Sequence, residues 1–109
     1  MDSYQRAASY AERIERELRS LGAWQSEALP DAAFDSQQAF FANTMTFYQW
    51  LQFVLLERVR QIVEQRGAFP EGSSVGAYAV RELDGHEEAG GLIAALCEFD
   101  DFIEGLGTK

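Results

Sequence analysis

The strongest folding signal in the chain lies between Thr46 and Gly67 and predicts one long helix. Thr46 and Gln49 have the spacing of a capping box, Met45 and Trp50 have that of a hydrophobic staple, and Gly67 is the expected left-handed stop. Apolar residues then recur at helical spacing, at Phe47, Trp50, Leu51, Val54, Leu55, Val59, Ile62 and Val63. Such a wide apolar surface is typical of a helix that is central in a bundle.

The N-terminal residues predict an amphipathic helix from about Ser3 to Leu21, with Asp2 or Ser3 as its cap. Its apolar positions are Ala7, Ala11, Ile14, Leu18 and Leu21. On the polar face, arginines alternate with glutamates, and Glu15 and Arg19 form a favourable i,i+4 pair. We expect this face to be solvated and largely self-neutralised.

A short helix is expected after the central one. Residues 68–74 have the composition of a turn, and the helix should run from Val75 to about Leu83 with Ser73 or Ser74 as its cap. No stretch of the sequence alternates polar and apolar residues as a strand does, so every predicted element is helical.

The last part of the chain predicts another amphipathic helix. Asp84 and Glu87 have the spacing of a second capping box. The apolar positions that follow are Leu92, Leu96, Phe99, Ile103 and Leu106. Gly90 and Gly91 are unfavourable inside a helix, so the helix should begin later or allow a neighbour to approach closely.

The connection Ala23–Asn43 is too apolar to extend freely into water. Its large apolar residues are Trp24, Leu29, Pro30, Phe34, Phe40 and Phe41. We expect it to fill a groove on the bundle, with a short helix after Ser36, or else to expose an aromatic patch for a partner. The sequence therefore predicts an all-α, four-helix bundle in a single domain over residues 1–109. It has three long helices, one short helix and a long aromatic loop between helices 1 and 2, and the central helix contacts the other three.

The charge of the chain limits its partners. The formal net charge is −9, and residues 82–109 hold eight of the 18 acids with Lys109 as their only base. This excess repels phosphate, so direct binding to nucleic acid or to anionic membranes is not expected. Polar residues also interrupt the apolar run of the central helix, which argues against a membrane span.

The sequence contains no pattern typical of catalysis, and we expect no metal and no cofactor. The single histidine, His86, has no partners at the spacing of a catalytic or metal site, and there is no glycine-rich phosphate loop. The single cysteine, Cys97, excludes an internal disulfide and is expected to be a partly buried structural thiol. One free thiol and no secretory signal indicate a cytoplasmic protein.

The most suggestive polar feature is an acidic cluster in the expected last helix. On a helical wheel Glu98, Asp101 and Glu104 point away from the core, and Asp100 lies at its edge. Carboxylates near a helix C-terminus oppose the helix dipole, so the cluster is either a solubilising face or a docking surface for a basic partner. The candidate interaction surface consists of Glu98, Asp101, Glu104, Phe40, Phe41 and Trp50.

Residues in and before the central helix resemble a known family. The pattern is Leu21-Gly22-x-Trp24, Phe34, Ser36-Gln37-Gln38-x-Phe40-Phe41, Thr44-Met45, Trp50-Leu51-Gln52-Phe53-Val54 and Arg58, followed more weakly by Phe69-Pro70 and Leu96-x-x-Phe99-Asp100. It is similar to that of the YqcC-like family of small bacterial proteins. The resemblance implies a small helical bundle without an established enzymatic activity. Genes of that family often neighbour the gene for tRNA pseudouridine synthase C, which implies an accessory role near RNA modification.

Two functions are expected from these observations. The first is a non-catalytic interaction or accessory protein, with a basic RNA-modifying enzyme as its protein partner. The second is a helical bundle that binds a small molecule in a pocket lined by Trp24, Phe34, Phe40, Phe41 and Trp50. The chain is expected to be a monomer, or a weak homodimer through apolar area on the central helix.

Overall fold

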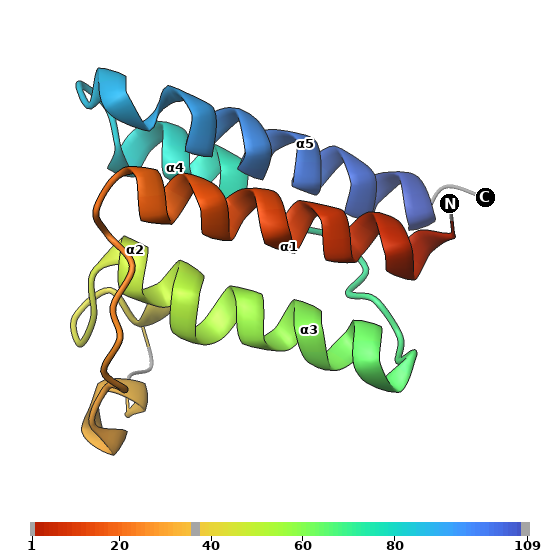
Figure 1. Cartoon of the computed structure of the whole chain (residues 1–109), viewed down its shortest axis with the longest axis horizontal. Coiled ribbons are helices and arrows are strands. Elements are labelled where there is room, and N and C mark those ends of the chain that lie inside the picture. Colours follow the sequence, from red (N-terminus) through yellow and green to blue (C-terminus); the bar gives the residue numbers. More distant parts are fainter. Residues whose placement is uncertain (1, 36–37, 108–109) are drawn as a thin grey trace.

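The computed structural model describes residues 2–35 and 38–107, and their regular structure is helical throughout (Figure 1). The elements are α1 (Ser3–Ser20), α2 (Phe47–Trp50), η3 (Leu51–Leu55), α3 (Leu56–Gln65), α4 (Val75–Glu82) and α5 (Gly90–Gly107). Three short 3₁₀ turns lie in the connections: η1 (Asp31–Phe34), η2 (Ala39–Phe41) and η4 (Glu87–Ala89). The all-α prediction is confirmed.

Helix α1 occupies the middle of the molecule. It packs against α3 on one side and α5 on the other, and α4 packs against α5 (Figure 1). Its buried positions include the small residues Ala7 and Ala11, which let both neighbours come close. The helix beginning after Thr46 is expected to be the central one, but this place belongs to α1: α3 makes its main helix–helix contact with α1, and α2 meets α4 through Phe47 and Tyr78.

The helix that begins after Thr46 starts as the sequence predicts but contains a π-turn. Thr46 and Gln49 form both hydrogen bonds of the capping box. Within η3, the Leu56 N–H donates to the Leu51 carbonyl, an i→i+5 bond that adds one residue to the turn. The later residues are thereby rotated by about 100° relative to an uninterrupted α-helix. Leu51 and Leu56 are both fully buried as a result, whereas Leu55 is half-buried.

The end of α3 is held by contacts from α1. The left-handed residue is Arg66, with φ 49°, and the expectation that Gly67 takes this role is wrong. The Tyr4 hydroxyl lies 3.0 Å from the Arg66 carbonyl oxygen and 2.9 Å from that of Gly67. The Arg66 guanidinium lies over the Tyr4 ring and pairs with Asp2 at 3.4 Å. These tertiary contacts stabilise a conformation that arginine seldom adopts.

Helix α4 is capped by a carboxylate of α5. Neither Ser73 nor Ser74 provides the side-chain cap that the sequence predicts. Instead Asp100 accepts hydrogen bonds from the backbone N–H groups of Val75 (3.1 Å) and Gly76 (2.7 Å), and from the Ser73 hydroxyl (2.5 Å). The three bonds join the start of α4 to α5.

The start of α5 also differs from the prediction. The capping box expected from Asp84 and Glu87 is not formed, because the η4 turn begins at Glu87 and its cap, His86, makes no side-chain cap bond. Gly90 has helical dihedrals and is the first residue of α5. The close approach of a neighbour expected here occurs at Gly91, where a Cβ atom would clash with the Glu17 carboxylate of α1. A second close approach lies at Gly76 in α4, where a Cβ atom would lie 2.7 Å from the Cα of Cys97.

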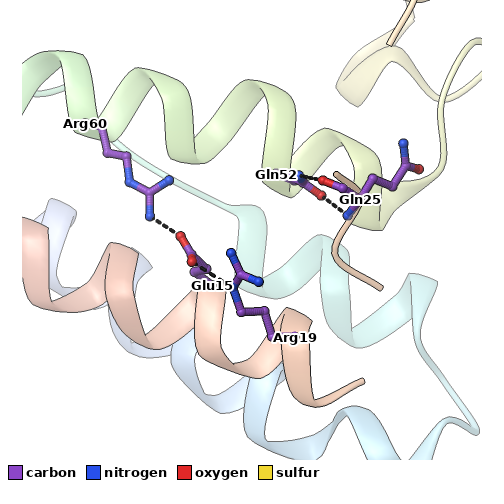
Figure 2. A network of polar contacts seen from close by, with 5 residues as sticks. All are labelled: Glu15, Arg19, Gln25, Gln52 and Arg60. Carbon is purple, nitrogen blue, oxygen red and sulfur yellow. Dashed lines mark hydrogen bonds and ion pairs between the residues drawn. The ribbon is translucent and has the colours of Figure 1, made fainter. Parts of the chain in front are cut away.

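The aromatic connection, residues 23–43, is hydrogen-bonded to the helix that follows it (Figure 2). The buried Gln52 side chain accepts from the Gln25 N–H (2.9 Å) and donates to the Gln25 carbonyl (2.7 Å). Of the large apolar residues in the connection, Pro30 and Phe34 are exposed, Phe34 at 40%, and the others are half-buried. The short helix expected after Ser36 is replaced by the η2 turn, in which Phe40 and Phe41 have positive φ, while Ser36 itself lies outside the described residues. The two ends of the connection thus pack on the bundle, through Trp24, Phe40 and Phe41, whereas the segment around η1 is mostly exposed and projects away from the helices (Figure 1).

A carboxylate bridges α1 and α3 (Figure 2). Glu15 in α1 accepts hydrogen bonds from Arg60 in α3 (2.5 Å) and from Arg19 (2.9 Å). These bonds, that of Arg60 first, lower the pKa of the Glu15 carboxyl. The stabilisation is complete above the unfolded-state pKa of about 4.3 and is lost as the pH falls through the folded-state pKa.

The Glu15→Gln variant should therefore be less stable at pH 7 by about 1 kcal/mol, and this difference should shrink below about pH 4. Urea unfolding at a series of pH values measures it. Glu12→Gln, on an exposed position of the same helix, should change stability by less than about 0.5 kcal/mol. A Glu15→Gln deficit that stays constant down to pH 3 would contradict the assignment.

Candidate functional site

An apolar groove runs along α3 and is bounded on its other side by residues 67–75, and we call it the α3 groove. Its volume is about 630 Å³. The residues that line its floor are almost completely buried: Trp50, Val59, Val75, Phe99 and Ile103. Leu55, Ile62 and Phe69 form apolar walls, and Arg58, Gln61 and Gln65 add polar groups from α3. The groove therefore combines an apolar interior with polar side chains of α3 on one side and with Ser73 and Ser74 on the other.

The π-turn determines which residues of α3 line this groove. Leu51 faces the core, and in an uninterrupted α-helix Leu55 and Ile62 would share its face. The added residue of the π-turn places Leu56 on the core-facing side of the helix, beside Leu51. Leu55 and Ile62 are turned away from the core and line the groove. Arg58 lies between them in sequence and is exposed. Turns of this type are frequent at functional sites.

Phe40 and Trp50, which line the α3 groove, belong to an aromatic cluster. Phe40 stacks on Tyr78 of α4, with ring centroids 4.0 Å apart, and meets Trp50 edge-on at 4.7 Å. Phe47 lies beside the same two rings, at 5.2 Å from Tyr78 and 6.3 Å from Trp50. Phe40 has φ 58° and reaches this position from the η2 turn. It thus packs between the aromatic side chains of two helices.

The expected aromatic pocket is only partly assembled. Phe40 and Trp50 line the α3 groove, and Trp50 is 8% exposed. Phe41 instead packs edge-on against Phe34, at 6.3 Å between ring centroids, and neither ring lines the groove. Trp24 also lies outside it and stacks under the Arg19 guanidinium. Two of the five predicted rings are therefore brought together at the groove.

The acidic residues of the candidate surface lie on the exposed side of α5. Glu98, Asp101 and Glu104 are all exposed, as the helical wheel predicts. Glu98 pairs with Arg13 of α1 at 2.9 Å, and this hydrogen bond lowers the pKa of the Glu98 carboxyl. Asp101 and Glu104 form no ion pair with any residue that the structure describes.

These acids belong to a larger surface, which we call the acidic face. Its members are exposed carboxylates of α4, α5 and the turn between them: Glu82, Asp84, Glu87, Glu88, Glu98, Asp101 and Glu104. In the same region, residues 75–107, the basic side chains are Arg81 and the single histidine, His86. Glu88 lies 3.1 Å from His86. The α4–α5 side of the molecule is therefore strongly negative.

Cys97 lies against α4 and is not activated. It is half-buried, and burial, followed by the charges of Asp100, Asp101 and Glu98, raises the pKa of its thiol. A thiol with a raised pKa is a weak nucleophile at neutral pH. Within residues 2–35 and 38–107, no cluster of three or more His, Cys, Asp or Glu side chains is arranged to hold a metal ion. In the same ranges, no helix is long and apolar enough to cross a membrane.

The fold and these surfaces define a class of small all-α protein with an apolar groove and a separate acidic face. A family model described as DUF446, tRNA pseudouridine synthase C, matches residues 6–102. The chain belongs to this family.

Relatives in two bacteria support the assignment. YqcC of Escherichia coli is 27% identical over 101 residues, which cover 92% of this chain and 93% of YqcC. The solution NMR structure of E. coli YqcC superposes with a TM-score of 0.82 at 26% identity, covering 95% of this chain and 90% of that one. A protein of Haemophilus influenzae is 24% identical over 92 residues, 84% of this chain and 87% of its own length. Both relatives are named uncharacterized proteins, so the comparisons confirm the YqcC-like resemblance and establish no activity.

Proposed function

We propose that this protein is a non-catalytic accessory protein that docks through its acidic face on a basic surface of an RNA-modifying enzyme. The observation that carries the proposal is the charge of residues 75–107, where seven exposed carboxylates are accompanied by Arg81 and, from α1, by Arg13 as the partner of Glu98. Such a surface attracts and orients a positively charged partner over a distance of about 10 Å at moderate salt.

The acidic face is unfavourable for the isolated protein. Asp101 and Glu104 lie near the C-terminus of α5, where negative charge opposes the helix dipole, and they are three residues apart on one face. An arrangement that weakens local stability in this way is typical of a surface with a function. A basic partner would neutralise these charges and remove the repulsion.

The family description supports the kind of partner. It names tRNA pseudouridine synthase C, and an enzyme that binds tRNA presents lysines and arginines to the phosphate backbone. The acidic face of this chain has the opposite sign and is unsuited to contact RNA itself. We therefore take tRNA pseudouridine synthase C as the partner to test.

The test measures binding of the purified chain to purified tRNA pseudouridine synthase C at low and high salt. The affinity should fall with salt, and the double variant Asp101→Lys/Glu104→Lys should bind at least about tenfold more weakly. The matched control is Glu57→Lys/Glu64→Lys, which makes the same charge change on exposed positions of α3. Absence of binding at low salt would refute this partner, and equal losses in both double variants would refute the acidic face as the docking site.

A further inference from the structure

We infer that the α3 groove binds a linear apolar molecule that carries one carboxylate. Its apolar part would lie on Trp50, Phe99 and Ile103, and its carboxylate would meet Arg58. The site is separate from the acidic face and does not depend on the docking proposed above.

The low exposure of the lining residues and the volume of the groove limit the shape of the ligand. Five residues that line it are each no more than 8% exposed: Trp50, Val59, Val75, Phe99 and Ile103. Because these side chains expose so little surface, a bulky partner such as an α-helix about 10 Å across would make little contact with them. An alkyl chain is slim enough to reach them. The volume of about 630 Å³ falls within the range of roughly 300–1,000 Å³ found for small-molecule sites.

The charge of the groove selects the polar group of the ligand. No Asp or Glu lines the groove, and Arg58 is its one ionisable side chain among the described residues. The other two arginines of the same helical stretch are paired, Arg60 with Glu15 and Arg66 with Asp2. Arg58 forms no ion pair with any residue in the described ranges. A groove with a free cation, in a chain of net charge −9, is complementary to an anion.

A carboxylate fits this position better than a phosphate. One guanidinium can hold one carboxylate through two parallel hydrogen bonds. A phosphate monoester carries nearly two charges and is usually held by several cations, whereas Arg58 is alone at the groove. Gln61 and Gln65, on the same wall, offer neutral amide donors for the remaining lone pairs.

Trp50 makes the proposal directly measurable. The chain has two tryptophans, and Trp24 lies outside the groove, so the Trp24→Phe protein reports on the groove through Trp50 alone. Hexanoate, octanoate and decanoate, each kept below its micelle-forming concentration, should change the Trp50 fluorescence in a saturable manner. The affinity should rise by up to about fourfold for each added methylene group. Decanol, which has the same chain and no charge, should bind more weakly than decanoate.

Charge variants in the same Trp24→Phe background test the role of Arg58. Arg58→Glu should weaken decanoate binding at least about tenfold and leave decanol binding unchanged. Arg16→Glu, an equal charge change on an exposed position of α1, should leave both unchanged. The inference is overturned if no carboxylate gives a saturable change, or if the two variants weaken decanoate equally. Binding of an apolar acidic peptide without binding of any of the three carboxylates would also overturn it.

Discussion

The Asp100→Ala variant should lose about 2–4 kcal/mol of unfolding free energy, because its carboxylate caps a helix other than its own. Asp100 accepts hydrogen bonds from the first two N–H groups of α4 and from the Ser73 hydroxyl. Removing it leaves Val75 and Gly76 without this acceptor on a partly buried surface. Urea unfolding followed by circular dichroism measures the loss.

The neighbouring residue provides the control. Asp101→Ala removes the same charge from an exposed position and should change stability by less than about 0.5 kcal/mol. Asp100→Asn keeps the shape and one carbonyl acceptor but loses the charge, so its loss should be intermediate. If Asp100→Ala and Asp101→Ala have equal effects, the capping role of Asp100 is refuted.

The Gly76→Ala variant should be destabilised by about 1–3 kcal/mol, although alanine favours helices more than glycine does. A Cβ atom at position 76 would lie 2.7 Å from the Cα and 2.8 Å from the N of Cys97. Both are backbone atoms of α5, so a side-chain movement cannot relieve the clash, and α4 must move away from α5. Thermal and urea unfolding of the variant measure the effect.

Gly90→Ala is the matched control for this substitution. Gly90 begins α5 with φ −55°, and a Cβ atom there would meet nothing within 4 Å. Helix propensity should therefore dominate, and this variant should gain up to about 1 kcal/mol. Equal effects of the two substitutions would show that the close approach of α4 to α5 is not as the structure has it.

Local signals in the sequence predict most of the fold. The capping box at Thr46, the Asp2 cap of α1 and the four–three spacing of α1 and α5 depend on residues three or four apart, and the structure contains all of them. Asp100 was expected only at the edge of an acidic cluster, because its partners Ser73, Val75 and Gly76 lie 24–27 residues away. No local pattern contains such a contact.

Local sequence misplaces the left-handed stop of α3 for the same reason. Glycine is the usual residue at such a stop, so the sequence favours Gly67. Arg66 takes the conformation because Tyr4 and Asp2, more than 60 residues earlier, hold its carbonyl and its guanidinium.

The helix after Thr46 has a wide apolar surface because it contains the π-turn, which a helical wheel cannot show. The wheel assumes 3.6 residues in every turn, whereas η3 contains one residue more. The sequence does contain a sign of the added residue. On an uninterrupted helical wheel, Arg58 falls on the same apolar stripe as Leu51, Leu55 and Ile62. A charged residue on an otherwise apolar stripe is a reason to test a shifted register.

The α3 groove was less predictable than the helices. Its position depends on how far α3 stands from α4, and that distance is set by packing on α1 and by the insertion of Phe40 between Trp50 and Tyr78. Aromatic composition identified Phe40 and Trp50 correctly as neighbours of a pocket. It gave no reason to leave out Trp24, Phe34 and Phe41, which pack elsewhere.

The π-turn also bears on how sequences of this family should be aligned. A helix with one additional residue in η3 has two registers, one before Leu51 and another after Leu55. A relative whose helix lacks the additional residue would align with this chain both before Leu51 and after Leu55 only if the alignment contained a one-residue gap inside the helix. Its counterparts of Leu55 and Ile62 would then belong to the core, and it would have no equivalent apolar wall. The difference between a helix wholly engaged in the bundle and one that also borders a groove is therefore a single residue in length.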